Sequence, residues 1–333
     1  MLAERVLRTG FRNTGDAARK HRRNARSVAS PHAGADVLSR LAGSVFHVGS
    51  AVERADVVAR MLDVYVVRPD AGVADEDGAV GAALGGVVGV AGPSRVEGRS
   101  ATVDALALDR HEPASIAHAV GVARDHARRA REVVSTELWD CLDVTRSRMP
   151  RKVAVDRAHE FLGWVRERSA LAVGVVEGDA SRDEVWEFFT LGRSLLRCGL
   201  TARLLASTLV DASSSASWNT ALRACGAGEA FRRGRDHHGV EAQDAAHFLL
   251  HDVHSPRSLA FLAARADDCL ADVAPGCVAD EVGAFRTART AMDRVDPAEP
   301  GALRSAADRM AVAVGAVVGA LDERVFAVAA PAH

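Results

Sequence analysis

Residues 38–66 of the chain have the sequence LSRLAGSVFHVGSAVERADVVARMLDVYV. Apolar side chains recur in this stretch at alternating steps of three and four residues: Leu38, Leu41, Val45, Val48, Val52, Ala55, Ala59, Leu62 and Val66. This spacing places them on one narrow stripe of an α-helix, like the contact seam of a helical bundle. We call this stripe the apolar seam. It predicts a long helix that is capped by Ser39 and stopped by Pro69.

A second stretch repeats the first at a constant interval of 143 residues. Its seam consists of Phe188, Leu191, Leu195, Cys198, Ala202, Leu205 and Leu209, and Ser181 is the expected N-cap. The same interval matches Phe46/Phe189, Gly49/Gly192, Arg54/Arg197, Arg60/Arg203, Asp109/Asp252, His111/His254, Pro113/Pro256 and Ser115/Ser258. The interval is the same for the matches at 46–60 and for those at 109–115, although dissimilar sequence separates them. We therefore infer a tandem duplication.

The rest of the chain lacks the period-2 alternation of strands. It predicts one long helix over 111–149, further helices over 153–173, 241–272, 278–295 and 302–327, and a loop with weak helix over 70–102. The expected fold is all-α, a duplicated helical bundle whose two similar halves pack together. Residues 37–177 would form the first repeat, 178–327 the second, and 1–36 a basic, disordered arm.

Composition excludes several classes of function. The 333 residues carry a net charge of −2 and only 5% aromatics, so a nucleic-acid-binding protein is not expected. Five cysteines without a CxxC pair do not form a disulfide framework, and they favour a reducing, cytoplasmic location. No apolar run reaches the roughly 20 residues of a membrane span. All Lys and Arg residues except Lys20 and Lys152 are arginines. Anions should therefore be bound mainly by the forked guanidinium groups of arginine.

A polar stripe runs beside the first seam: Glu53, Asp56, Arg60 and Asp63. Two interpretations stay open. The charges could pair along the helix at i,i+4 and i,i+3. Alternatively, they could line a half-buried pocket in which Glu53 has a shifted pKa. The matching positions of the second copy are Leu196, Gly199, Arg203 and Ala206, so only the first copy keeps the acids.

Other constellations are weaker. His247, His251 and His254 would share a helical face with Asp244 if the helix continued, which makes them weak candidates for a metal site, although we predict none. The Asp-His-Pro pattern at 109–113 and 252–256 could be a catalytic dyad but is more typical of a helix start. No nucleotide-binding loop, HExxH or GxSxG motif occurs, so no cofactor is predicted.

Several motifs in order resemble the Alpha-E domain family, a predicted all-helical family with a Glu-Arg motif. They include Val52-Glu-Arg-Ala-Asp56, Ser135-Thr-Glu-Leu-Trp139 and Leu222-Arg-Ala-Cys-Gly-Ala-Gly-Glu-Ala-Phe231. By this resemblance, Glu53 and Arg54 are the Glu-Arg pair, Arg197 survives from it in the second copy, and Glu137 is a further family position. His126 stands where the family usually has Asn.

The resemblance implies a role in peptide synthesis or modification, with an ATP-grasp-type ligase and a transglutaminase-like protein as partners and a peptide as a ligand. We therefore expect an accessory or binding component that uses Glu53, Arg54, Asp56, Arg60, Asp63, Glu137, Arg197 and Arg203. One alternative is an enzyme in which Glu53 is the general acid/base. Another is a purely structural scaffold.

Overall fold

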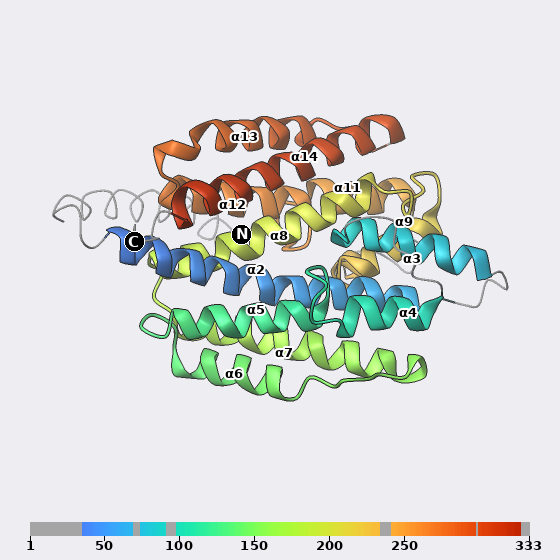
Figure 1. The fold of residues 1–333 in the computed structure, drawn as a ribbon. Helices are drawn as coiled ribbons and strands as arrows, with labels where there is room; N and C mark the ends of the chain where they lie inside the picture. Colours follow the sequence, from blue (N-terminus) through green and yellow to red (C-terminus); the bar gives the residue numbers. More distant parts are fainter. Residues whose placement is uncertain (1–34, 69–73, 91–97, 234–240, 298, 328–333) are drawn as a thin grey trace, which may run out of the picture. The chain divides into compact units, whose positions relative to one another are not determined.

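The computed structural model describes residues 35–68, 74–90, 98–233, 241–297 and 299–327, and every regular element in these ranges is a helix (Figure 1). The α-helices are α2 (Ala35–Val66), α3 (Ala74–Val88), α4 (Arg99–Val103), α5 (Ile116–Arg129), α6 (Thr136–Ser147), α7 (Ala158–Asp179), α8 (Glu184–Ala206), α9 (Ser215–Ala224), α10 (Gly228–Arg232), α11 (Ala242–His251), α12 (Leu259–Val273), α13 (Ala279–Asp293) and α14 (Pro300–Leu321). Short 3-10 segments, Val155–Arg157 and Gly276–Val278, precede α7 and α13, and π-helical segments, Asp104–Leu108 and Asp322–Phe326, follow α4 and α14. The all-α fold class predicted from the sequence is confirmed.

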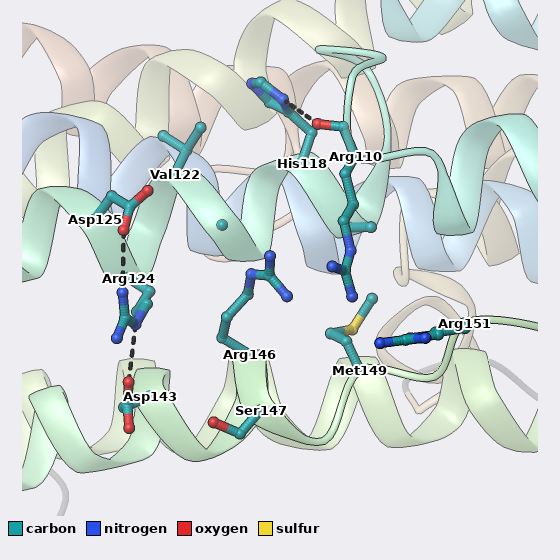
Figure 2. Close-up of a pocket in the computed structure, with 12 residues that line it drawn as sticks. Arg110, His118, Val122, Arg124, Asp125, Asp143, Arg146, Ser147, Met149 and Arg151 are labelled. Atoms are coloured by element: carbon teal, nitrogen blue, oxygen red, sulfur yellow. Dashed lines mark hydrogen bonds and ion pairs between the residues drawn. The ribbon is translucent and has the colours of Figure 1, made fainter.

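Within the compact unit formed by residues 39–333, the contacts between helices join α8 to one group and α5 to another. Helix α8 packs against α12 and α14, and α14 packs against α13. Helix α5 packs on α6, and α6 packs on α7. An ion pair between Arg124 of α5 and Asp143 of α6 links these two helices, with 2.8 Å between Nε and Oδ1 (Figure 2). Helix α2 meets α5 where the rings of His47 and His126 lie 4.7 Å apart.

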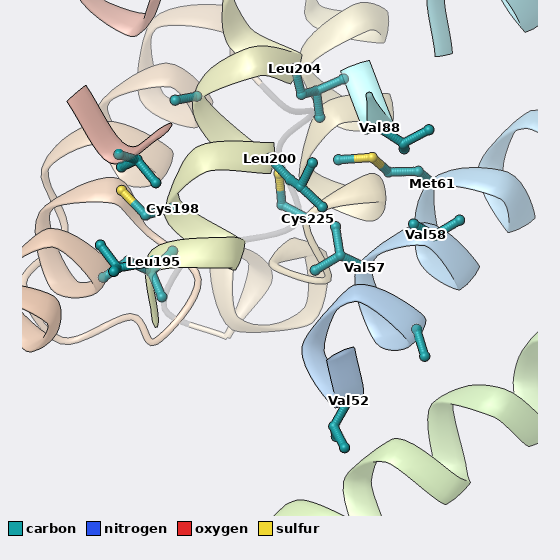
Figure 3. Close-up of a cluster of buried hydrophobic side chains, with 14 of the residues drawn as sticks. Val52, Val57, Val58, Met61, Val88, Leu195, Cys198, Leu200, Leu204 and Cys225 are labelled. Atoms are coloured by element: carbon teal, nitrogen blue, oxygen red, sulfur yellow. The ribbon is translucent and has the colours of Figure 1, made fainter. Parts of the chain in front are cut away.

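Both apolar seams are buried, as their spacing predicts. The α2 seam is buried from Leu41 to Leu62, and the α8 seam is buried from Phe188 to Leu205. The core also extends beyond the seams. Figure 3 shows Val57 and Met61 of α2 near Leu200 and Leu204 of α8, and all four side chains are buried. Because α2 and α8 are covered on more than one face, they form the interior of the fold.

Helices α2 and α8 cross backbone to backbone at two glycines. A Cβ atom on Gly49 would overlap the carbonyl oxygen of Phe189, and a Cβ atom on Gly192 would overlap the carbonyl oxygen of Phe46. The contact is reciprocal, and it joins the residues that the interval of 143 pairs. Glycine is needed at both positions because any side chain would push the helices apart.

The starts of α5 and α12 have the same local structure. Ser115 and Ser258 are their N-caps, and their hydroxyls accept hydrogen bonds from the amides of His118 and Phe261 at 3.0 and 3.1 Å. Each serine hydroxyl also donates to the carbonyl oxygen of the aspartate six residues earlier. The Asp-His-Pro pattern thus precedes a capped helix start, as this pattern typically does.

Several predicted helix boundaries are wrong. Residues 111–149 form two helices, because the chain turns at 130–135 and Ser135 caps α6 by accepting from the amide of Leu138 at 3.2 Å. Residues 241–272 divide into α11 and α12 at the turn before Ser258, where Pro256 indicates a break in the helix. The weakly periodic stretch 70–102 contains α3, whose residues Leu84, Val87 and Val88 are buried. Tertiary packing makes this segment helical although its own pattern is poor.

The expected caps of the seam helices are also wrong. Ser39 lies inside α2, which starts at Ala35. Asp183, and not Ser181, caps α8 by accepting from the amides of Val185 and Trp186. Pro69 and most of the predicted basic arm lie outside the described residues, although α2 already ends at Val66. Among the helices of the described part, none combines the length and the apolar character needed to cross a bilayer.

Candidate functional site

Glu53 lies at the interface of α2 and α8 rather than in an open pocket. Its side chain is 2% exposed. Its Oε2 atom accepts a hydrogen bond from Nε of Arg193 at 3.2 Å, and its Oε1 atom accepts one from Arg197. Both arginines belong to α8, so the carboxylate of one seam helix is held by two guanidinium groups of the other. Charge-assisted bonds of this kind are stronger than neutral ones.

Asp56, one helical turn further along α2, is surrounded by three guanidinium groups. Nε of Arg60 lies 2.9 Å from its Oδ2 atom, and Nη1 of Arg257, from the turn before α12, lies 3.0 Å from the same atom. Nη2 of Arg197 is 3.8 Å away. Arg197 therefore bridges Glu53 and Asp56, and its Nη1 atom also donates to the carbonyl oxygen of Pro256 at 3.2 Å.

We call Glu53, Asp56, Arg60, Arg193, Arg197 and Arg257 the ion network. Burial alone would raise the pKa of Asp56, but Arg257, Arg60 and Arg197 outweigh it and lower this pKa to about 2. Burial lowers the pKa of Arg257, and the nearby Arg197 adds to this effect. The network joins α2, α8 and the turn before α12 through charges that are mostly withdrawn from solvent. It locks the packing of these elements, because removing one partner would leave buried charge uncompensated.

Arg54 points away from this network. Its Nη1 atom donates to the carbonyl oxygen of Val88, the last residue of α3, at 3.0 Å. Burial lowers its pKa, and the nearby like charge of Arg203 lowers it further. Two arginines thus gather at the C-terminal end of α3, where the helix dipole favours positive charge. The Glu-Arg pair of the sequence therefore acts at two different places in the fold.

The remaining predicted residues lie apart from the ion network. Asp63 contacts α7 and not Arg60. Its carboxylate oxygens lie 2.6 Å from Nδ1 of His159 and 3.3 Å from Nη1 of Arg166. Glu137 is exposed in the first turn of α6. Of the predicted pairs along α2, Asp56–Arg60 forms and Arg60–Asp63 does not.

The three candidate metal-binding histidines do not share a helix face, since α11 ends at His251 and His254 lies beyond it. His251 contacts the carbonyl oxygen of Val295 through Nε2 at 3.1 Å. Across the residues that the structure describes, no group of three or more potential metal-ligating side chains occurs.

A protein-family model described as "Alpha-E: a predicted alpha-helical domain with a conserved ER motif" matches residues 37–326. The chain belongs to the Alpha-E family. Comparisons with curated proteins and with solved structures each gave no significant match. In this Alpha-E chain, the Glu-Arg pair that the sequence places at Glu53 and Arg54 combines a glutamate facing α8 with an arginine facing α3.

Two members of the ion network, Arg193 and Arg257, are absent from the site residues predicted from the sequence. Arg257 directly follows the second Asp-His-Pro pattern, and the matching position after the first is Ala114, so the matched positions give no signal for Arg257. Arg193 has the counterpart Ser50. Its position, four residues before Arg197 on the same helix face, is the signal that points to a second partner for one carboxylate.

Proposed function

We propose that this chain is a non-catalytic binding component of a peptide synthesis or modification system, working with an ATP-grasp-type ligase and a transglutaminase-like protein. Family membership supports the system, and the arrangement of Glu53 supports the non-catalytic role. Both oxygens of this carboxylate accept hydrogen bonds from arginine, and the side chain is 2% exposed. A general acid/base needs to reach the proton that it transfers, and Glu53 faces protein on both sides.

The ion network has a positioning role in this proposal. It fixes α2, α8 and the turn before α12 relative to one another, so that the outer helices present a rigid surface to partners. The structural-scaffold alternative differs only in that this surface binds nothing.

Co-purification tests the proposal. The tagged chain is expressed together with an ATP-grasp-type ligase and a transglutaminase-like protein from the same source, and the eluate is separated by size. A complex containing at least one of the two supports a binding component. If the chain elutes alone at micromolar concentrations of all three proteins, the scaffold alternative holds instead.

Glu53→Gln separates the binding component from the enzyme alternative. The reaction is reconstituted from this chain and the two partner proteins, at temperatures where the variant stays folded. Loss of a general acid/base would lower the rate of product formation by about 10²–10⁴-fold. We expect the rate to change less than threefold there and the melting temperature to fall. A large rate loss in a fully folded variant would refute the non-catalytic role.

A further inference from the structure

A cleft of 660 Å³ lies between α5 and α6, away from the ion network (Figure 2). Its volume is within the range of small-molecule sites. The lining residues are Arg110, Ala117, His118, Gly121, Val122, Arg124, Asp125, Asp143, Arg146, Ser147, Met149 and Arg151. None of the residues predicted as site residues from the sequence belongs to this set.

The lining of the cleft is strongly basic. Four guanidinium groups face two carboxylates, which leaves an excess of two positive charges. Both carboxylates are engaged at one end, where Arg124 contacts Asp143 at 2.8 Å and Asp125 at 3.3 Å. The arginines at the other end, Arg110, Arg146 and Arg151, form no ion pair with these acids.

These three arginines have no hydrogen-bond acceptor or ion-pair partner for their guanidinium groups among the described residues. Arg146 is half-buried on α6, and its pKa is lowered by burial and by the nearby Arg110. Like charges of this kind repel one another, so the cleft is stabilised by any anion that enters it.

The three side chains come from different segments and approach the same space. Figure 2 shows Arg110 and Arg146 reaching into the cleft from opposite sides and Arg151 reaching in from a third direction. The segment that carries Arg110 is tied to α5, because Nδ1 of His118 donates to the carbonyl oxygen of Arg110 at 3.0 Å. Arg146 extends from a regular helix. The backbone segments that carry two of the three guanidinium groups are thus fixed before any ligand binds.

We propose that this cleft binds a small molecule through a phosphate monoester group. A phosphate monoester carries about two negative charges at pH 7, which matches the excess of two positive charges. Its three terminal oxygens point in different directions and can each accept from a separate guanidinium group. A single carboxylate has only two oxygens in one plane, so it suits a fork from one arginine better than donors from three directions.

Calorimetric titration of the full chain with inorganic phosphate and with O-phosphoserine tests this site. The variants are Arg146→Met and Arg151→Met, and the matched control is Arg148→Met. Arg148 is exposed at the end of α6 and does not line the cleft, so the control makes the same change in net charge. A tri-glutamate peptide is titrated in parallel as a carboxylate ligand.

We expect both phosphate ligands to bind, with affinity lowered about tenfold or more in each cleft variant and less than twofold in the control, because each lost contact is charge-assisted. Three results overturn the proposal: no heat with either phosphate ligand, an equal loss in the control, or binding of tri-glutamate alone. Melting curves of the variants confirm that they are folded. Since no partner protein is present, the result is independent of the co-purification.

Discussion

Glu53 on α2 accepts a hydrogen bond from Arg197 on α8, and these two residues come from the two segments that the interval of 143 matches. Arg197 is the counterpart of Arg54, the arginine adjacent to Glu53 in the sequence. The second segment has Leu196 in place of the glutamate, yet it keeps the arginine that the first segment's glutamate binds. The contact gives Arg197 a carboxylate partner although its own segment has none at the adjacent position.

Glu53→Leu should lower the free energy of unfolding by about 3–5 kcal/mol, because Arg193 and Arg197 lose their buried partner. Denaturant titration measures the change. Glu137→Leu makes the same chemical change at an exposed position and should stay within about 0.5–1 kcal/mol. Similar losses in both variants would mean that the ion network contributes little to stability.

Asp56→Asn should remove part of the acid sensitivity of the protein. The folded-state pKa of Asp56, about 2, lies below its ordinary value of 3.8. Between these values the unfolded chain binds more protons, so stability rises with pH and is lost as pH falls toward 2. The difference corresponds to about 2 kcal/mol. Unfolding followed from pH 2 to 5 should show a flatter dependence in the variant, and an unchanged slope would exclude Asp56 as a source.

His126 should make the fold less stable at mildly acidic pH. Burial, with the nearby His47 and Arg129, lowers its pKa from 6.5 to about 4. In this window the unfolded chain binds the proton more readily, so stability falls as pH drops from 6.5 toward 4. His126→Asn should reduce that fall. Melting temperatures at pH 7 and pH 5 check it, and an equal drop in both proteins would contradict the assignment.

Gly49→Ala should destabilise the crossing of α2 and α8 by about 3 kcal/mol or more, because the new methyl group would overlap the carbonyl oxygen of Phe189. Gly192→Ala should have a similar effect, because its methyl group would overlap the carbonyl oxygen of Phe46. Gly174→Ala is the control. No atom lies within 4 Å of a Cβ placed there, so this substitution in α7 should stabilise the fold by about 0.5–1 kcal/mol. A neutral effect at Gly49 would show that the helices can separate without loss.

The helices that the sequence predicts well are those whose apolar spacing is strong. The seams of α2 and α8 are periodic over many turns, and both helices formed where expected. Boundaries were predicted poorly at the turn 130–135, which lacks glycine and proline, and at α3, a helix that depends on its neighbours. The tandem duplication stays a prediction, with the matched serine caps and the reciprocal glycine contact as its structural correlates.

The sequence by itself determined the helical class, the two seams and the absence of acids at the matching positions of the second segment, because periodicity and composition are properties of the chain alone. Only the tertiary structure decided what the charged residues do. Glu53 and Arg197 are 144 positions apart, and Arg110 and Arg146 meet across a cleft between separate segments. Pairing over such separations depends on how helices pack, and local spacing carries no information about it.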